Sequence, residues 1–400
     1  MAIVSDMADS DLVGEYLELG LALGRHIDGL VDAYYGPREL ADRVRLGPLI
    51  EPAALSERAR RLLGQLDSEG DLAAARRRWL AAQVRGLHTT ARRLAGEPMA
   101  YLDEIESCYG VRPTYVPEDV FAGAHRRLDG VLAGPGGLRE RYIAWREAQV
   151  VPPERIAEVL SSLAEDFRAR TRDAYGLPEG EGVDFELVSG QPWSGFNYYL
   201  GGLRSRVAIN TDLPLLAPVV GHLVAHEAYP GHHTEHSRKE AGLVRRKHQQ
   251  EETIFLVGTP QCLMAEGLAD LGLEVITAGR PEAAVAAHLR PRGLPYEAEV
   301  AATVGEATEL LGAVRGNAAI LVHDRGATVE EAVSYVERWL LTTPERAAKA
   351  VGFVMDPTWR AYVFCYIDGL RLCRQFTAGD PGRFERLISE QLLPADLVAA

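Results

Sequence analysis

The sequence predicts a mainly α-helical protein with one small β-sheet or hairpin near residues 184–210. Three observations support this prediction. Apolar residues recur every three or four positions through most of residues 1–175, as they do along one face of an amphipathic helix. Alternation of apolar and polar residues, typical of strands, is confined to residues 184–210, and the helical pattern resumes from Pro214 onward.

The N-terminal part of the chain is expected to consist almost entirely of helices. One helical face extends from residue 11 to about residue 34, and the same pattern returns over residues 72–94. A longer helix is expected over residues 153–175, because it begins with a proline, which suits the first turn of a helix. Clusters of glycine and proline at residues 134–137 and 151–153 separate such helices.

The best candidate boundary is the segment 176–182, which is rich in glycine, proline and glutamate. It divides the chain into an N-terminal helical region, residues 1–175, and a second region, residues 176–400. Because the connecting segment is short, we expect the first region to form one wall of a shared cleft rather than an independent domain.

The middle of the chain carries the strand signals. Residues 184–188 and 206–210 alternate apolar and polar side chains and are expected to be strands. The loop between them, residues 189–202, is rich in glycine and aromatic residues, which fits either a surface that faces a substrate or an ordinary long turn. After it, one helix is expected from about residue 217 into the 220s, and others near residues 253–278, 297–311, 329–341, 344–351, 357–376 and 382–392.

Composition narrows the class of protein. The 400 residues include 43 Lys and Arg against 57 Asp and Glu, a formal net charge of −14, which disfavours nucleic acid and anionic membrane surfaces as partners. No apolar run approaches the roughly 20 residues of a membrane helix, and the acidic N-terminus lacks the basic segment of a secretory signal. Four scattered cysteines suggest neither a disulfide framework nor a thiolate metal site. We therefore expect a cytoplasmic protein.

Histidines are concentrated in one short segment. Five of the eleven lie between residues 222 and 236, where an even distribution would place about 0.4. The segment contains the pair His226-Glu227, which in zinc peptidases belongs to the helical motif H-E-x-x-H, whose two histidines share one face and bind one metal. Here the fourth residue after His226 is Pro230, which cannot bind a metal.

Pro230 and Gly231 indicate how a second histidine reaches the metal. Proline cannot donate to the carbonyl four residues earlier, so a kink or bulge is expected directly after Glu227. A bulge that absorbs two residues would place His232 where the second histidine normally lies. In an unbroken helix His233 would share the face of His226, but about 10.5 Å further along the axis, so we favour His232 and keep His233 as the alternative.

Glu266 is the candidate third ligand. A zinc site with two histidines often takes a carboxylate as its third ligand and leaves the fourth position to water. Glu266 lies on the next expected helix among Leu, Met and Ala, where a solvated carboxylate is unusual, although a helix-surface glutamate is the alternative interpretation. Asp270, one turn later, could accept the ring N–H of a ligating histidine.

The string His226-Glu227-Ala228-Tyr229-Pro230-Gly231-His232-His233, followed by Glu266-Gly267-Leu268-Ala269, resembles a widespread bacterial uncharacterised-domain family with the pattern H-E-x-x-P-G-H-H. That family is similar to gluzincin-type zinc metallopeptidases akin to the carboxypeptidase Taq group, whose large helical fold encloses a cleft. Two further segments, residues 321–332 around His323 and residues 366–369 beginning with Tyr366, resemble later motifs of the family. The family's tryptophans are replaced by Leu268 and Ala327.

The resemblance implies a zinc-dependent hydrolase, most simply a carboxypeptidase- or dipeptidase-like metallopeptidase with one zinc ion bound by His226, His232 and Glu266. Glu227 would be the general base on a metal-activated water, and Tyr366 and His323 are candidate donors to the developing oxyanion. The substrate would be a peptide or a small amide.

Two further expectations concern substrate binding. The strand at residues 206–210 could pair its edge with an extended peptide, and Arg204 or Arg206 could hold a substrate carboxylate. Three alternatives remain for the protein as a whole. They are a metal-dependent amidase or deacylase acting on a small molecule, a non-catalytic metal-binding scaffold, and a helical nucleic-acid-binding protein, which the charge disfavours.

Overall fold

The computed structural model describes residues 2–68, 72–191 and 193–398. It confirms the mainly α-helical fold, and these residues form two small sheets where one was predicted. The helices that precede the larger sheet are α1 (Ala2–Gly24), α2 (Arg38–Leu46), α3 (Pro52–Asp67), α4 (Ala74–Leu94), α5 (Tyr101–Tyr109), α6 (Glu118–Val131), α7 (Leu138–Ala148) and α8 (Pro153–Tyr175). The α-helices that follow it are α9 (Ala217–Glu227), α10 (His232–Lys239), α11 (Pro260–Ile276), α12 (Pro281–Leu289), α13 (Ala298–His323), α14 (Val329–Trp339), α15 (Pro344–Met355), α16 (Val363–Thr377), α17 (Pro381–Leu387) and α18 (Pro394–Val398).

Three short helices of other types complete the helical part. They are the π-helix η1 (Glu240–Arg245) and the 3₁₀ helices η2 (Gln250–Thr253) and η3 (Arg290–Arg292). Helices α14 and α15 lie within a few residues of their predicted positions. Helices α11 and α16 begin later than predicted, α12 was not predicted, and α13 continues to His323, well beyond the predicted end. Among the described residues, none of the helices combines the length and the apolar character that a membrane span requires.

The larger sheet has three strands, in the order β2 (Gly182–Val188), β4 (Arg204–Asn210), β3 (Gly195–Gly201). β2 and β4 are parallel, and β3 is antiparallel to β4. The two predicted strands are therefore present, but a third strand occupies the segment expected to be a loop; Pro192 of that segment lies outside the described residues. Because β4 is the central strand, its edges are already paired, and the prediction that residues 206–210 pair with a peptide is wrong.

A second, two-stranded sheet joins distant parts of the chain. β1 (Val31–Tyr34) pairs antiparallel with β5 (Ile254–Leu256). Both strands lie in segments predicted to be helical, because short apolar runs do not distinguish a buried strand from a helix. Helix α1 ends before Gly29, whose positive φ of 79° starts the turn into β1.

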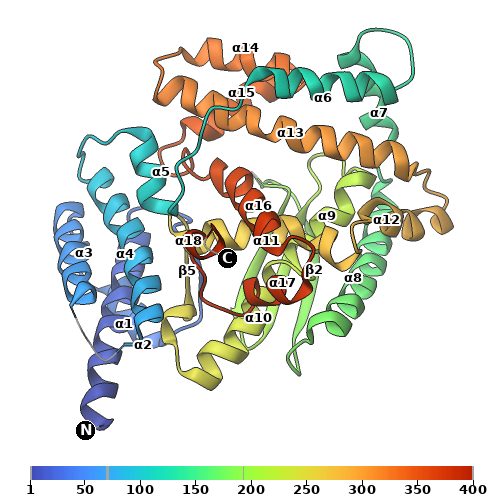
Figure 1. The fold of residues 1–400 in the computed structure, drawn as a ribbon. Helices are drawn as coiled ribbons and strands as arrows, with labels where there is room; N and C mark the ends of the chain where they lie inside the picture. Colours follow the sequence, from blue (N-terminus) through green and yellow to red (C-terminus); the bar gives the residue numbers. More distant parts are fainter. Residues whose placement is uncertain (1, 69–71, 192, 399–400) are drawn as a thin grey trace.

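Two hydrophobic cores organise the molecule. The larger core includes residues from Val13 to Leu397, so that α1, α3, α4 and α8 share it with α9, α11 and α16. The smaller core joins α6 and α7 to α13, α14 and α15. Figure 1 shows α11 and α16 near the centre, with α1, α3 and α4 on one side, α8 and α12 on the other, and α13 with α6 and α14 across the top.

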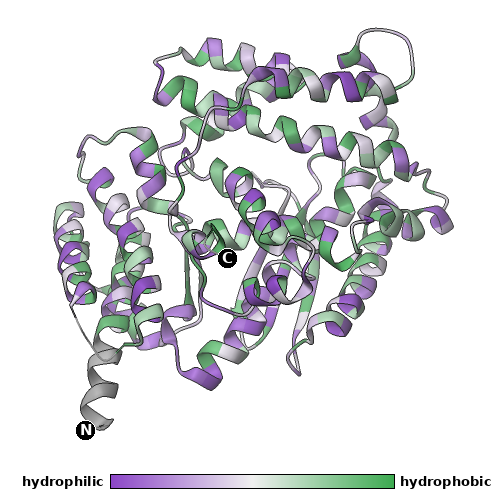
Figure 2. Cartoon of the chain, viewed as in Figure 1, coloured by the Kyte–Doolittle hydropathy of each residue, from purple (hydrophilic) through white to green (hydrophobic). Residues whose placement is uncertain are grey.

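Peripheral helices carry mixed surfaces. In Figure 2, α3 and α4 alternate between hydrophilic and hydrophobic residues along their length, as expected for helices with one face on the core and one in water. Each of the two hydrophobic cores contains residues from both sides of residue 175, so the two regions do not have separate cores. The region 1–175 contributes β1 and α8 to the surroundings of the central helices.

Candidate metal centre

The histidine segment forms two helices separated by a bulge. α9 ends at Glu227, the Tyr229–Pro230 peptide bond is cis, and α10 begins at His232. The backbone N–H of Gly231 donates to the carbonyl of Ala225 (2.9 Å), and that of Thr234 to the carbonyl of Ala228 (3.2 Å). Both bonds reach back six residues instead of four, so the interruption accommodates two additional residues.

The bulge brings His232 next to His226. Their Nε2 atoms lie 3.1 Å apart, and the closest oxygens of Glu266 lie 3.4 Å from Nε2 of His226 and 3.6 Å from Nε2 of His232. Zinc bonds of about 2.0–2.1 Å at tetrahedral angles separate two ligand atoms by roughly 3.4 Å. The three separations are close to that value, so these atoms surround a space of the right size for one metal ion.

The carboxylate of Glu266 provides a second observation that fits a metal ion at this place. Its Oε2 is buried and has no hydrogen-bond partner among the described residues. A buried carboxylate oxygen without a partner is costly, and a cation between the two imidazoles would satisfy it. The donor set of two imidazoles and one carboxylate is the set that zinc prefers in hydrolases, so the residues present fit that metal.

Polar contacts orient two of these three side chains, His226 and Glu266. The Nδ1–H of His226 donates to Oδ1 of Asp270 (2.8 Å), which leaves Nε2 facing the centre. The hydroxyl of Tyr362 donates to Oε1 of Glu266 (2.7 Å). Nε2 of His222 also lies 3.3 Å from Oδ1 of Asp270, so His222 and His226 share one carboxylate oxygen.

Two glycines allow the helices that carry Glu266 and Tyr362 to approach closely. A Cβ on Gly267 would lie 2.3 Å from the carbonyl oxygen of Gly369, and a Cβ on Gly369 would lie 2.5 Å from the carbonyl oxygen of Leu263. Helices α11 and α16 therefore cross with their backbones in contact. The crossing places the residue before Gly267, which is Glu266, beside the start of α16.

Burial and neighbouring charges shift the pKa values of the three candidate ligands in opposite directions. Burial lowers the pKa of His226, but the hydrogen bonds and charges of Asp270 and Glu266 outweigh it and hold the pKa well above its usual value. Burial lowers the pKa of His232 to about 4, so this imidazole is neutral and available as a ligand near pH 7. Burial raises the pKa of Glu266, but the neighbouring imidazole of His226 and the hydrogen bond from Tyr362 lower it overall.

Glu227 lies beside the three candidate ligands at the end of α9. Burial, with the charges of Glu266 and Asp270, raises the pKa of Glu227 to about 7 in spite of His226. Strand β3 passes directly over this carboxylate, because a Cβ on Gly195 would lie 3.1 Å from its Oε1. Asn197 of the same strand donates from Nδ2 to the carbonyl of Glu227 (2.6 Å). A carboxylate with a pKa near neutrality is suited to accept and return a proton.

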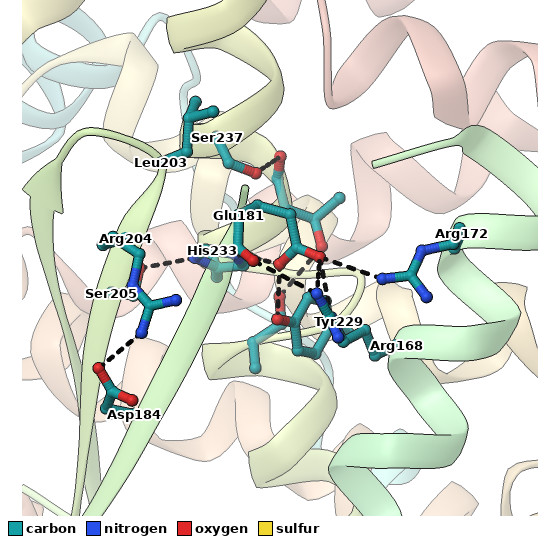
Figure 3. A network of polar contacts seen from close by, with 12 residues as sticks. Arg168, Arg172, Glu181, Asp184, Leu203, Arg204, Ser205, Tyr229, His233 and Ser237 are labelled. Carbon is teal, nitrogen blue, oxygen red and sulfur yellow. Dashed lines mark hydrogen bonds and ion pairs between the residues drawn. The ribbon is translucent and has the colours of Figure 1, made fainter. Parts of the chain in front are cut away.

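His233 has a different environment. It is fully buried, and its Nε2–H donates to Oε2 of Glu181 (3.0 Å), while the hydroxyl of Ser205 donates to its Nδ1 (2.8 Å). Tyr229 donates to the same oxygen of Glu181 (2.7 Å), and Arg168 holds the other oxygen (Figure 3). This network ties the bulge to β4 and α8. The structure therefore brings His232, not His233, to His226.

Tyr366 and His323 occupy different places. The ring of Tyr366 lies 5.4 Å from that of Tyr362, which bonds to Glu266, and Tyr366 is 39% exposed. His323 ends α13, and its Nε2 bonds to the carbonyl of Val354 (2.7 Å) while its ring packs on Tyr101. None of the described contacts of His323 involves the candidate ligands. The structure therefore does not bring His323 to this cluster, because the last turn of α13 directs it toward α15.

The two arginines expected to hold a substrate carboxylate are already paired. Arg204 contacts Asp184 (2.8 Å) and Arg206 contacts Glu186 (2.6 Å), both across the parallel strand pair β2–β4. These are diagonal pairs of the parallel strands, since Arg204 lies opposite Gly182 and Arg206 opposite Asp184, and each arginine contacts the carboxylate two residues further along β2. The prediction for Arg204 and Arg206 is therefore wrong.

Two residues near the cluster are not evident from the motif. Tyr362 lies one turn before Tyr366, so the four-residue spacing of the two tyrosines could have indicated it. Asp32 lies on β1 between Val31 and Ala33, where burial and the charges of Glu266 and Glu227 raise its pKa to about 7. A lone aspartate in an apolar strand was the available signal for Asp32.

Comparisons with known proteins add information on the fold. Neither the protein-family models nor the curated proteins compared with the chain give a match. Among solved structures, the chain is similar to the putative lipoprotein from Colwellia psychrerythraea, with a TM-score of 0.53 at 17% sequence identity. The similarity covers 86% of this chain and 65% of that protein, so the chain spans less than two thirds of its length. At this identity the likeness concerns the fold alone.

Proposed function

We propose that the protein is a zinc-dependent metallopeptidase that hydrolyses peptide bonds in small substrates. The proposal depends mainly on one observation. Nε2 of His226, Nε2 of His232 and the carboxylate of Glu266 converge at separations of 3.1–3.6 Å beside the high-pKa carboxylate of Glu227. The family resemblance of the motif around these residues, and of Glu266-Gly267, points to the same activity.

The polar surroundings favour a hydrolase over a scaffold that merely binds metal. A structural zinc site is usually closed by four protein ligands, whereas a catalytic site keeps one position for water or substrate. Here His226, His232 and Glu266 supply three ligand atoms, and the carboxylate of Glu227, the residue after His226, has no hydrogen-bond partner among the described residues. An unpartnered acid with a pKa near 7 has no evident structural role at that position.

In the proposed mechanism, His226, His232 and Glu266 hold the zinc ion, and Asp270 and Tyr362 keep two of these ligands oriented. Bound zinc would supply Lewis acidity toward the scissile carbonyl and make water acidic enough to lose a proton near pH 7. Glu227 takes that proton from the attacking water and delivers it to the nitrogen of the leaving amine. One water is consumed, the C–N bond breaks, and a carboxylate and an amine leave.

Two further groups are placed to assist. The hydroxyl of Tyr366, exposed beside Tyr362, is the candidate donor to the oxyanion that forms as water attacks. Strand β3 lies at the edge of its sheet and passes over Glu227, so its main chain near Gly195 replaces residues 206–210 as the candidate edge for an extended peptide.

The test combines metal content with one substitution. Protein purified without added metal or a histidine tag should contain about one zinc per chain, measured by plasma mass spectrometry. Glu227→Gln should keep that zinc and lose at least about 100-fold of the peptide hydrolysis rate, because general-base catalysis contributes roughly 10²–10⁴-fold. Glu39→Gln, at an exposed position on α2, is the matched control. Hydrolysis at the wild-type rate by Glu227→Gln would remove the general-base assignment.

A further inference from the structure

Four aromatic side chains form a continuous row that begins at a candidate metal ligand. The hydroxyl of Tyr362 donates to Oε1 of Glu266 (2.7 Å). The ring centroid of Tyr362 lies 5.4 Å from those of Tyr366 and Trp359, in both cases with the rings edge to face. The ring centroid of Phe353, on α15, lies 6.4 Å from those of Trp359 and Tyr362. Each step of the row is therefore a direct contact between side chains.

The row is also accessible to solvent. Phe353 is 38% exposed and Tyr366 is 39% exposed, whereas Trp359 and Tyr362 are half-buried. No other phenylalanine, tyrosine or tryptophan of the described residues is exposed to this degree. The two most exposed aromatic residues of the described chain thus lie in one row of contacting rings that ends at a candidate ligand. Adjacent exposed apolar side chains are typical of a binding surface rather than of a core.

The turn between α15 and α16 holds the middle of the row in place. The backbone N–H groups of Trp359 and Arg360 donate to the carbonyl of Asp356 (3.1 and 2.8 Å). The guanidinium of Arg360 pairs with Glu104 of α5, which fixes the turn from the other side. The indole of Trp359 also packs against Gly29, where a Cβ would lie 3.2 Å from its Cζ2. The rings are therefore ordered before any ligand binds, which lowers the entropic cost of binding.

We propose that the aromatic row, formed by Phe353, Trp359, Tyr362 and Tyr366, is the subsite for a large apolar side chain, so that the protein selects peptides with an aromatic residue next to the cleaved bond. This inference rests on the proposed peptidase function and names the substrate class of the same site. Tyr366, the candidate donor to the oxyanion, is one of the four rings, so a side chain packed on the row belongs to a residue beside the attacked carbonyl. The row would bury the apolar surface of a phenylalanine and contact its ring, and alanine offers neither.

The experiment moves one phenylalanine through each position of pentaalanine and identifies the cleaved bond by mass spectrometry. With zinc-loaded wild type, a phenylalanine next to the cleaved bond should raise kcat/KM at least about 10-fold over pentaalanine. Phe353→Ala and Trp359→Leu should each reduce this preference to less than about 3-fold, because the apolar surface of the row is lost. Calorimetry with zinc-loaded Glu227→Gln separates binding from hydrolysis, and the phenylalanine peptide should bind at least about 10-fold more tightly than pentaalanine.

Leu310→Ala on α13 is the matched control. Leu310 is an apolar residue with 37% exposure, and its neighbour Glu309 pairs with Arg374, toward the opposite end of α16 from Tyr362. The control should keep the full preference, and zinc content and thermal unfolding of every variant show whether the metal and the fold are intact. If the wild type treats phenylalanine peptides and pentaalanine alike, or if both row variants keep the preference, the inference is overturned while the peptidase function stands. If zinc-loaded protein hydrolyses no peptide of a wide panel, the proposed function fails, and this inference fails with it.

Discussion

Replacing Gly231 by alanine should destroy the metal centre without touching any ligand. A Cβ at this position would lie 1.9 Å from the carbonyl oxygen of His226 and 2.6 Å from that of Ala225. Both obstacles are backbone atoms of α9, so no flexible side chain can move away. The segment between α9 and α10 would have to shift by roughly 1 Å or more, and the bond from the Gly231 N–H to Ala225 would be lost with it.

The expected magnitude follows from these two effects. Overpacking costs about 1–3 kcal/mol, and leaving a buried backbone group unpaired costs about 1–3 kcal/mol more. The total of roughly 2–6 kcal/mol is a large part of the 5–15 kcal/mol by which a typical domain is stable. Any relaxation that relieves the clash also moves His232 relative to His226, and zinc distances tolerate only about 0.2 Å. We therefore expect at least a 100-fold loss of zinc affinity.

The assay is zinc binding against a competing chelator, with thermal unfolding of the metal-free protein measured in parallel. Gly64→Ala in α3 is the matched control, since a Cβ there meets nothing within 4 Å. That control should bind zinc normally and be equally or slightly more stable. If Gly231→Ala binds zinc like the wild type and unfolds at the same temperature, the account of the bulge given above is incorrect.

Three further predictions concern the surroundings of the centre. Burial raises the pKa of Glu181, but hydrogen bonds from His233, Tyr229 and Arg168 outweigh it and lower the pKa to about 2. Glu181 should therefore contribute on the order of 1–3 kcal/mol of stability above its unfolded pKa near 4.5. That contribution should disappear as the pH falls from about 4.5 toward 2, so urea unfolding of Glu181→Gln should depend less on pH in this range than that of the wild type; equal slopes would contradict this. Asp270→Asn should weaken zinc binding about 10- to 100-fold in the chelator assay, because the carboxylate no longer holds Nδ1–H of His226, and unchanged affinity would show that this contact does not orient the ligand. Tyr366→Phe should keep the zinc and lower kcat by about 10- to 100-fold with little change in KM, whereas loss of metal would assign it a structural role instead.

The candidate ligands on α9, α10 and α11 were predicted from the sequence. His226, His232 and Glu266 could be identified because their chemistry depends on residue type and short spacing, and the geometry of Pro230-Gly231 could be derived from backbone rules alone. The helix predictions are wrong where a strand is too short for the period of its side chains to be recognised. β1 and β5 lie in segments predicted to be helical, because strands of three or four residues are too short to show whether their side chains recur with the period of a strand or of a helix.

Asp32 could not be identified from the sequence for a different reason. It belongs to no local pattern, and the pairing of its strand β1 with β5 joins two segments that are far apart in the chain. His323 shows the converse. It was named from a local resemblance, and the direction of the last turn of α13, which no local pattern specifies, takes it to Val354 instead.

The glycines near the candidate ligands share one property, which is that a side chain at each of them would collide with a backbone oxygen. Gly231 follows the bulge between two candidate ligands, Gly267 follows Glu266, and Gly369 lies three residues after Tyr366. In each case a Cβ would fall within 2.5 Å of a backbone oxygen of the neighbouring turn or helix. Three side chains from separate helices can meet around a space a few ångströms wide only when their backbones come closer than ordinary helix packing allows. Substituting one of these glycines should therefore lower metal affinity more than substituting a surface glycine would. Such a difference would distinguish a metal centre whose geometry depends on close backbone contacts from a group of histidines that merely lie at one helix end.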